Sequence, residues 1–246
     1  MSAEASVAHA GGMTTEDPRA AGLARFAALI ADETRAVCLL ALLDGRAWTA
    51  GELARHAGVA ASTLSEHLSR LVAGGLLTEE RQGRHRYVRL ADARIAQLVE
   101  DLAARVAPGA RPRTLRQAGA GSAMARGRTC YDHLAGRLGI AVTDALTGRG
   151  LLRQDTGFAL TDAGLRWFGT AGIGLDRRGR RPLARACLDW TERRPHLAGV
   201  AGAALCRHAL DTGWCVRIGT ERAVKVTAAG ERALSELLGI EAEKLR

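Results

Sequence analysis

Two stretches of the chain carry the same pattern of reactive side chains. Residues 130–136 read CYDHLAG and residues 187–199 read CLDWTERRPHLAG, so each has Cys-x-Asp followed by His-Leu-Ala-Gly. Thiolate, imidazole and carboxylate groups together suit Zn²⁺ or a similar borderline ion. The pattern therefore indicates a candidate metal or redox site whose members are Cys130, Asp132, His133, Cys187, Asp189 and His196.

Other interpretations of the same residues stay open. Each Cys is small enough to pack at the start of a helix, and each Asp can cap a helix or pair with an Arg. Because intracellular cysteines are commonly buried core residues, packing is the favoured interpretation. Cys130 and Cys187 are alternatively a redox pair. A thiol enzyme would use Cys130 and His133 on one helix, but no oxyanion glycine motif, phosphate loop or nucleotide fingerprint accompanies them, so we expect no enzyme.

The repeated stretches belong to a longer internal repeat. With a shift of 63 residues, Gly139 falls on Gly202 and Gly150 on Gly213, and ALTDAGLRWF at 159–168 then matches KVTAAGERAL at 225–234. Each copy predicts a helix (133–149 and 196–212), two short strands, and a closing helix capped by Thr161 or Thr227. Because helix, hairpin and helix form the tail of a winged-helix unit, we expect two degenerate winged-helix-like modules, at about 130–173 and 187–240.

The N-terminal half predicts a helix-turn-helix. Residues 24–43 have apolar side chains at helical spacing, and TAGE at 49–52 is a capping box that opens a short helix ending near Gly58. The next helix is predicted over 61–71, where Leu64, Leu68 and Leu71 form one buried stripe. A short helix, a turn at a glycine and a second helix with a polar N-terminus are typical of this motif.

A basic hairpin follows the second helix. Leu76 to Arg81 predicts a strand, residues 82–84 a turn, and His85 to Leu90 the return strand. The hairpin carries four arginines, Arg81, Arg84, Arg86 and Arg89, at the place where a wing meets phosphate. Residues 91–107 then predict a further amphipathic helix, with Ile95, Leu98, Leu102 and Val106 on one stripe.

These N-terminal motifs resemble the ArsR-type winged-helix repressors. The resemblance rests on ADETR at 31–35, TAGELARHAG at 49–58, STLSEHLSRLVAGGLL at 62–77 and the RQGRHRYVRL wing, and it covers about residues 23–107. It implies a homodimer paired through the first helix and the helix after the wing. It also implies that two recognition helices enter successive major grooves of an inverted-repeat operator in double-stranded DNA.

The residues of the second helix and the wing agree with DNA binding. Hydroxyls at the helix N-terminus hold phosphate, Arg pairs with guanine and Glu with cytosine, and wing arginines add affinity without sequence information. A polar helix face that merely meets water is the alternative, and the adjoining helix and wing favour DNA. The candidate DNA-binding residues are Ser62, Thr63, Ser65, Glu66, His67, Arg70, Arg81, Arg84, His85 and Arg86.

The family's familiar metal sites are absent from this sequence. GELARHAG at 51–58 has no Cys, and ARIAQLVEDLAARVA at 93–107 has neither His nor Cys. Cys38 lies among leucines and is expected to pack in the core. Any effector is therefore unknown and must act elsewhere, through the Cys repeat or through an apolar pocket between the two modules, lined by Trp167, Phe168, Trp190 and Trp214. No cofactor is expected.

The totals of the 246-residue chain fit this reading. The net charge of +9 and the pI of about 10.3 favour a polyanionic partner, and no apolar run is long enough for a membrane span, so no membrane is expected. Five cysteines, an odd number, and a start unlike a secretory signal predict a cytoplasmic protein. The expected fold is mainly α with small β-hairpin wings (α+β). It has a flexible tail at 1–22, a DNA-binding domain at 23–107, a linker at 108–124, and a C-terminal repeat domain at 125–246 for dimerisation or sensing.

Overall fold

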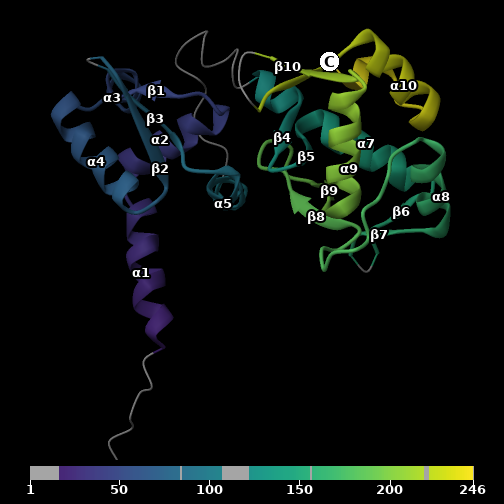
Figure 1. Ribbon diagram of the computed structural model, residues 1–246, viewed down its shortest axis with the longest axis horizontal. Coiled ribbons are helices and arrows are strands. Elements are labelled where there is room, and N and C mark those ends of the chain that lie inside the picture. Colours follow the sequence, from purple (N-terminus) through teal and green to yellow (C-terminus); the bar gives the residue numbers. More distant parts are fainter. Residues whose placement is uncertain (1–16, 84, 107–121, 156, 219–221, 246) are drawn as a thin grey trace, which may run out of the picture.

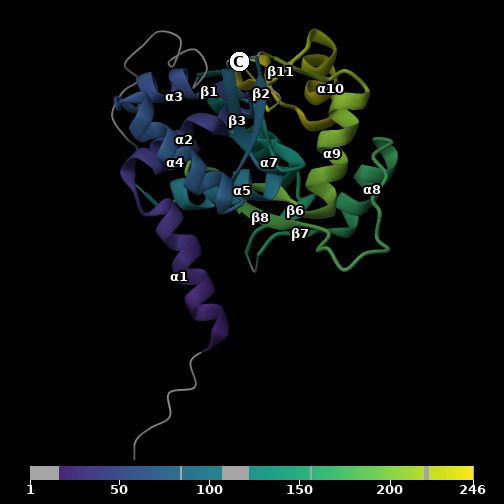
Figure 2. The same cartoon turned by 60° about the vertical axis from the view of Figure 1, so that its left-hand side comes forward.

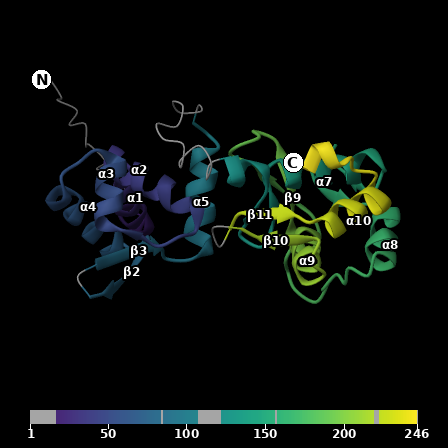
Figure 3. The same cartoon turned by 90° about the horizontal axis from the view of Figure 1, so that it is seen from above.

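The computed structural model describes residues 17–83, 85–106, 122–155, 157–218 and 222–245. These residues form two lobes, an N-terminal lobe (17–106) and a C-terminal lobe (122–245), which lie side by side in Figures 1 and 3. Arg84 and the basic stretch at 107–121, which holds Arg111, Arg113 and Arg116 of the expected linker, lie outside the described residues. Among the described residues, no helix has both the length and the apolar character needed to cross a membrane.

The N-terminal lobe is a winged helix-turn-helix, as the sequence predicts. The antiparallel sheet has the order β1-β3-β2, and the β2–β3 hairpin pairs Leu77 with Leu90 at its base and Gln82 with His85 at its tip. The elements of the lobe are α1 Pro18–Ile30, α2 Glu33–Ala41, η1 Leu42–Asp44, β1 Trp48–Thr49, α3 Ala50–Ala57, α4 Ala61–Ala73, β2 Leu77–Gln82, β3 His85–Leu90 and α5 Ala93–Ala103.

Local interactions fix the two helices of the motif. The capping box is confirmed, because Thr49 accepts from the Glu52 backbone and the Glu52 carboxylate accepts from the Thr49 backbone N–H. α3 ends at Gly58, which has φ +71°. Leu64, Leu68 and Leu71 of α4 are all fully buried, as expected of the stripe that packs α4 onto the core.

The expected single helix at 24–43 is two helices. The chain leaves the helical path at residues 31–32, and the Asp32 side chain then caps α2 by accepting from Arg35 N at 2.9 Å. The boundary of the expected tail at residue 22 is also wrong, because α1 already begins at Pro18, with Asp17 as its cap. Figure 2 shows α1 extending away from the rest of the N-terminal lobe.

The C-terminal lobe contains the same order of elements twice. Each copy has a β-hairpin, a helix, a second β-hairpin and a closing helix. The first copy comprises β4 Arg128–Cys130, β5 His133–Ala135, α7 Gly136–Gly148, β6 Leu152–Arg153, β7 Ala159–Leu160 and α8 Asp162–Thr170. The second comprises β8 Arg185–Leu188, β9 Pro195–Ala198, α9 Gly199–Asp211, β10 Cys215–Arg217, β11 Val224–Val226 and α10 Ala228–Leu238, followed by η2 Ala242–Leu245. Thr161 and Thr227 cap the closing helices, as predicted.

The helices expected from residues 133 and 196 begin three residues later. His133 and His196 instead lie in β5 and β9, the return strands of two hairpins that the sequence analysis did not anticipate. Gly136 and Gly199 make the transition, with φ of +72° and +85°. A Cβ at Gly136 would lie 2.6 Å from Ala125 O, so the backbone of the preceding segment occupies the space of a side chain.

The two copies pack reciprocally. β5 of the first copy lies on α9 of the second, and β9 lies on α7. A Cβ at Gly139 would lie 3.7 Å from His196 Cβ, and one at Gly202 would lie 3.1 Å from His133 Cβ. The glycine in the first turn of each helix therefore lets the histidine strand of the other copy approach closely.

One hydrophobic core joins both copies, and it accounts for most aromatic residues of the lobe. Phe168 is fully buried in this core, and Trp167 and Trp214 pack against it. Trp190 instead packs against the core of the N-terminal lobe. These side chains therefore pack in the hydrophobic cores. Their positions do not support the prediction that they line a pocket between the two modules.

Candidate DNA interface and buried cysteine-histidine cluster

The exposed face of α4 carries most of the predicted DNA-binding residues. The N-cap position is Ala60, which makes no side-chain capping bond, so no side chain occupies the N–H groups of the first turn. The helix dipole and these N–H groups favour an anion at this end. The exposed residues of the predicted set on α4 are Ser62, Thr63, Ser65, Glu66 and Arg70.

His67 faces the body of the lobe. Its Nδ1 lies 3.5 Å from Asp32 Oδ1 and 3.3 Å from Arg35 Nη1, and only 18% of its side chain is exposed. Arg35 in turn donates to the backbone oxygens of Ala28 and Leu29 at the end of α1. The residue predicted to reach a base therefore joins α4 to the α1–α2 junction.

Arg86 joins the wing to α4. Its guanidinium makes an ion pair with Glu79 on the neighbouring strand, and it donates to the hydroxyls of Ser65 and Ser69 at 3.4 Å. This arrangement fixes the position of the hairpin relative to the helix. Of the other predicted wing residues, Arg81 and His85 are exposed, and Arg84 lies outside the described residues.

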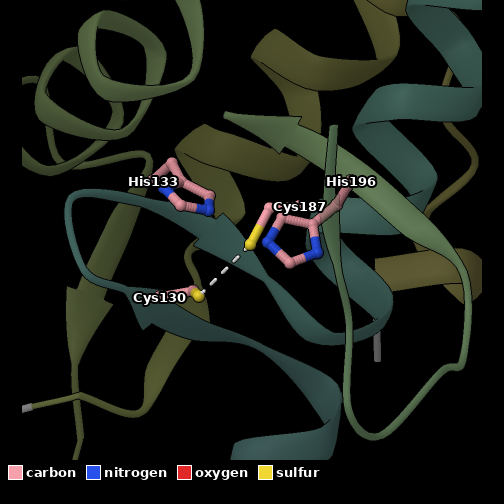
Figure 4. Close-up of side chains that lie close together, drawn as sticks. All are labelled: Cys130, His133, Cys187 and His196. Carbon is pink, nitrogen blue, oxygen red and sulfur yellow. Dashed lines mark hydrogen bonds between the residues drawn. The ribbon is translucent and has the colours of Figure 1, made fainter. Parts of the chain in front are cut away.

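Four of the six residues in the repeated Cys-x-Asp…His stretches meet in the C-terminal lobe. Cys130 pairs with His133 across the β4–β5 hairpin, and Cys187 pairs with His196 across the β8–β9 hairpin. Figure 4 shows the four side chains pointing toward one another. One ligand atom from each residue lies within 4.8 Å of all the others, and the two sulfur atoms are 3.9 Å apart. We refer to these four residues as the cysteine-histidine cluster.

The cluster is closed to solvent and leaves polar atoms without partners. Each of the four side chains belongs to a residue no more than 3% exposed. Among the described residues, His133 Nε2 and both ring nitrogens of His196 have no hydrogen-bond partner. A buried polar group without a partner costs on the order of 1–3 kcal/mol. Three such atoms beside two thiols therefore require an explanation, which packing alone does not provide.

The two aspartates lie behind the histidines. Asp132 Oδ1 is 3.3 Å from His133 Nδ1, and Asp132 also pairs with Arg181. Asp189 Oδ2 is 3.3 Å from His196 Nδ1, without the geometry of a hydrogen bond, and it accepts from the Gly136 backbone at 2.7 Å. Arg128 donates to the other oxygen of Asp189 at 3.0 Å. The carboxylates therefore hold arginines and histidines in place and are not members of the cluster.

Ionisation in and around the cluster is strongly shifted. The contact between the two thiols and the imidazoles of His133 and His196 lower the pKa of Cys187 well below its ordinary value. The same thiol pair, burial and the Glu100 carboxylate raise the pKa of Cys130. Burial, the largest single effect, would raise the pKa of Asp132 and Asp189. Arg181 and His133 together outweigh it at Asp132, and Arg128 with hydrogen bonds from Thr191 and the Gly136 and Glu192 backbone outweighs it at Asp189, so both pKa values are lowered.

The three cysteines outside the cluster are ordinary buried thiols. Burial raises the pKa of Cys38 to about 11 and of Cys206 and Cys215 to about 12. A thiol with such a pKa carries almost no thiolate at neutral pH and is a poor nucleophile or ligand. Cys38 packs among leucines, as the sequence predicts.

Side chains of α5 connect the cluster to the N-terminal lobe. Cys130 Sγ donates to Gln97 Oε1 at 2.9 Å and to Glu100 Oε2 at 3.1 Å, and Gln97 Nε2 donates to Cys187 Sγ at 3.5 Å. Glu100 is 1% exposed and also accepts from Arg128, Trp190 and Arg222. Gln97 and Glu100 were missed in the sequence because they are polar and lie off the apolar stripe of α5.

Comparison with known proteins shows which proteins this chain is similar to. The family described as "Helix-turn-helix domain" matches residues 30–80. The HTH-type transcriptional regulator YdfF of Bacillus subtilis (strain 168) is 39% identical over 221 residues, which are 89% of this chain and 97% of YdfF. Because only 25 residues of the chain fall outside that match, it includes most of the C-terminal lobe.

A second relative matches a shorter part. The HTH-type transcriptional regulator CmtR of Mycobacterium bovis (strain ATCC BAA-935 / AF2122/97) is 40% identical over 90 residues, which are 37% of this chain and 75% of CmtR. Among solved structures, the cadmium metal-sensor CMTR from Mycobacterium tuberculosis is 35% identical with a TM-score of 0.30, covering 37% of this chain and 96% of that one. The transcriptional repressor BigR from Xylella fastidiosa is 27% identical with a TM-score of 0.34, covering 37% and 92%.

Proposed function

Because the chain belongs to the HTH-type transcriptional regulators, with an ArsR-type winged helix-turn-helix at its N-terminus, we propose that it is a homodimeric repressor of an inverted-repeat operator. It is a DNA-binding transcription regulator, and its relatives are regulators rather than enzymes. The proposal has several parts: that the chain represses transcription, that it forms a dimer, that it acts in the cytoplasm, and that single residues have the roles given below. It also divides the chain into a DNA-binding domain that ends near residue 106 and a C-terminal dimerisation or sensing domain that begins near residue 122.

The observation that carries the proposal is the exposed polar face of α4 beside the wing. In this assignment Ser62 and Thr63 contact phosphate at the helix N-terminus, and Ser65, Glu66 and Arg70 face the base edges. Arg81 and His85 follow the adjacent phosphates from the wing, and Arg84 is assigned the same role from its sequence position alone.

His67 and Arg86 act as positioning residues in this assignment. Each already has partners within the protein, Asp32 and Arg35 for His67 and Glu79 and Ser65 for Arg86. Using either side chain to read a base would first break these contacts. Their role is to hold α4 and the wing at a fixed spacing, which the width of the DNA groove requires.

Exposed apolar side chains support the dimer. On the N-terminal lobe, the exposed large hydrophobic residues among those described are Leu23 on α1, Leu40 on α2, and Leu102 and Val106 on or just after α5, with Leu23 70% exposed and Leu102 41% exposed. A second copy that covers α1 and α5 would remove these side chains from water. Two copies related by a two-fold axis present two recognition helices, as an inverted-repeat operator requires.

A thiol-enzyme function has little support in the structure. Cys130 and His133 face each other across a hairpin and are 2% exposed, so no substrate carbonyl can approach the sulfur atom without opening the lobe. Burial and the neighbouring Cys187 and Glu100 also raise the pKa of Cys130, which opposes the formation of a nucleophilic thiolate.

A reporter assay tests the proposed sign and the recognition face together. The DNA upstream of the protein's own coding sequence is fused to a reporter in a heterologous host. We expect co-expression of the protein to lower reporter output, and Arg70→Ala to restore it. Arg166→Ala, which removes an exposed arginine from α8 in the C-terminal lobe, is the matched control and should repress like the wild type. Activation, or equal repression by Arg70→Ala, would contradict the proposal.

A further inference from the structure

We propose that Cys130, His133, Cys187 and His196 bind one borderline divalent cation of the Zn²⁺ class, and that its binding is transmitted to α5. The metal site itself stands independently of the proposed function, whereas its regulatory consequence rests on DNA binding by the N-terminal lobe. Neither of the metal-binding helices usual in the ArsR-type family supplies these residues, since the cluster belongs to the C-terminal lobe.

The spacing of the four side chains fits a tetrahedral ion. Two sulfur atoms at about 2.3 Å from a tetrahedral Zn²⁺ lie about 3.8 Å apart. The sulfur atoms of Cys130 and Cys187 are already 3.9 Å apart, and all four ligand atoms lie within 4.8 Å of one another. Small side-chain rotations therefore suffice to close the site, and the four residues complete a coordination shell of two sulfurs and two nitrogens.

The unpartnered nitrogen atoms point to a metal rather than a disulfide. His133 Nε2 and both ring nitrogens of His196 lack hydrogen-bond partners in a dry interior. Coordination of both Nε2 atoms would satisfy two of these three nitrogens, and the third, His196 Nδ1, lies 3.3 Å from Asp189 Oδ2. A disulfide between Cys130 and Cys187 would leave both histidines with no role and the same nitrogen atoms unsatisfied.

The repeated aspartate has a place in this site. Asp132 hydrogen-bonds to His133 Nδ1, and Asp189 lies 3.3 Å from His196 Nδ1, so each carboxylate is placed at the ring nitrogen opposite the cluster. Carboxylates behind histidine ligands fix the tautomer and direct Nε2 at the metal. The Cys-x-Asp…His pattern then supplies a sulfur ligand, an orienting carboxylate and a nitrogen ligand from each copy.

Charge balance favours a divalent ion. Two thiolates and one divalent cation sum to zero, and the adjacent buried groups Arg128, Arg222, Glu100 and Asp189 already compensate one another. A neutral centre avoids the large cost of an uncompensated buried charge. Sulfur and imidazole ligands select borderline ions over Mg²⁺ and Ca²⁺, which prefer oxygen.

A surface hollow borders one member of the cluster. Its lining includes Gln97, Tyr131 and His133, together with Arg94, Arg181 and Arg185. His133 therefore lies between the buried cluster and this hollow. The arginines are expected to slow the arrival of a free cation, while the equilibrium affinity is set by the ligands inside.

Metal binding would change the contacts to α5. In the structure the single S–H of Cys130 is within donor distance of both Gln97 Oε1 and Glu100 Oε2, and the hydrogen bond that they share attaches the C-terminal lobe to the helix that follows the wing. A metal-bound thiolate has no proton to donate, so this hydrogen bond is lost, whereas Gln97 Nε2 still finds a sulfur acceptor. The side-chain amide of Gln97 then has to rotate, because its oxygen has lost the S–H donor, and the Glu100 carboxylate loses the same donor. Because both residues belong to α5, metal binding shifts the preferred position of α5 relative to the C-terminal lobe.

The first experiment measures metal binding without DNA. The reduced, metal-free full-length protein is titrated with Co²⁺, and the visible absorption of tetrahedral Co²⁺ and the sulfur-to-metal charge-transfer band are recorded. We expect one Co²⁺ per chain, displaced by one Zn²⁺. Cys187→Ser should weaken binding at least tenfold, while Cys206→Ser, which removes a buried thiol of α9 outside the cluster, should bind like the wild type.

Several outcomes would overturn the site. One is a wild-type chain that takes up no Co²⁺ or Zn²⁺ at stoichiometric concentration, a result that does not depend on any variant folding. Another is an absorption spectrum without a sulfur-to-metal band. A reduced protein that binds no metal but forms a Cys130–Cys187 disulfide on oxidation would assign the cluster to redox chemistry instead.

The second experiment tests the coupling. We expect Zn²⁺ to change the operator Kd of the wild type by roughly tenfold, within the usual range for allosteric coupling. Gln97→Met should keep both Co²⁺ binding and metal-free DNA binding but reduce this change at least threefold, whereas Gln154→Met, at an exposed site on the C-terminal lobe, should leave it intact. Metal binding with an unchanged Kd would refute the coupling alone. Metal binding by a protein that binds no DNA would refute the proposed function and leave the site standing.

Discussion

At the scale of single residues, the Cys-x-Asp…His stretches show what types and spacing reveal. All six residues stand out in the sequence, and the structure brings four of them together and puts the two aspartates behind the histidines. Which residues meet depends on the pairing of Cys130 with His133 across one hairpin and of Cys187 with His196 across another. Spacing along the chain gives no sign of this, because a separation of three residues and one of nine produce the same cross-strand pair.

Gly202 is the residue whose substitution should disturb this arrangement most directly. A Cβ there would lie 2.4 Å from Leu197 O and 3.1 Å from His133 Cβ, so Gly202→Ala should lower the free energy of unfolding by about 1–3 kcal/mol. Gly148→Ala is the matched control, since a Cβ at this helical position meets nothing within 4 Å and should be neutral or stabilise by up to about 1 kcal/mol. Urea denaturation measures both. Equal stability of the two variants would show that the copies are not in close contact at this point.

At the scale of elements, those fixed by local sequence signals were predicted from the sequence, whereas those that depend on contacts between distant parts of the chain were missed. The capping box at Thr49 and the hairpin at residues 77–90 follow from side-chain and turn chemistry within a few residues, and both are confirmed. The hairpins at 128–135 and 185–198 were missed because their strands are short and read as the start of an apolar helix. Their stability comes from packing on α9 and α7, which lie far away along the chain.

The role of α5 was also beyond prediction from the sequence alone. Its apolar stripe was identified, but Gln97 and Glu100 on the other side contact the C-terminal lobe rather than water. A buried carboxylate surrounded by Arg128 and Arg222 is indistinguishable in sequence from an exposed one. The contact between α5 and the C-terminal lobe therefore became evident only in the structure, where both lobes are seen together.

At the scale of the whole molecule, the two lobes divide the work of the proposed regulator. The N-terminal lobe presents α4 and the wing, and the C-terminal lobe holds the buried cluster against α5. Figure 3 shows α5 on the side of the N-terminal lobe that faces the C-terminal lobe. A dimer formed through α1 and the uncovered part of α5 would place the helix that senses the cluster next to the subunit interface.

The proposed dimer can be tested at the exposed apolar part of α5. Leu102→Glu puts a charge on the exposed apolar part of α5 and should raise the dimer dissociation constant at least tenfold, because the charge would be buried without a partner. Leu188→Glu is the control, since Leu188 in β8 has the same exposure of 41% but lies on the C-terminal lobe. Sedimentation equilibrium compares the two. Dissociation by Leu188→Glu alone would move the interface to the C-terminal lobe.

The most direct measurement of the central claim is fluorescence anisotropy of the full-length protein on labelled duplex DNA from upstream of its own coding sequence. We predict tight binding of two chains per duplex, weakening at least tenfold between about 50 and 200 mM salt as phosphate contacts release counterions. A scrambled duplex of equal length should bind far more weakly. No binding at either salt concentration, or equal binding to the scrambled duplex, would contradict the claim that α4 and the wing read a specific operator.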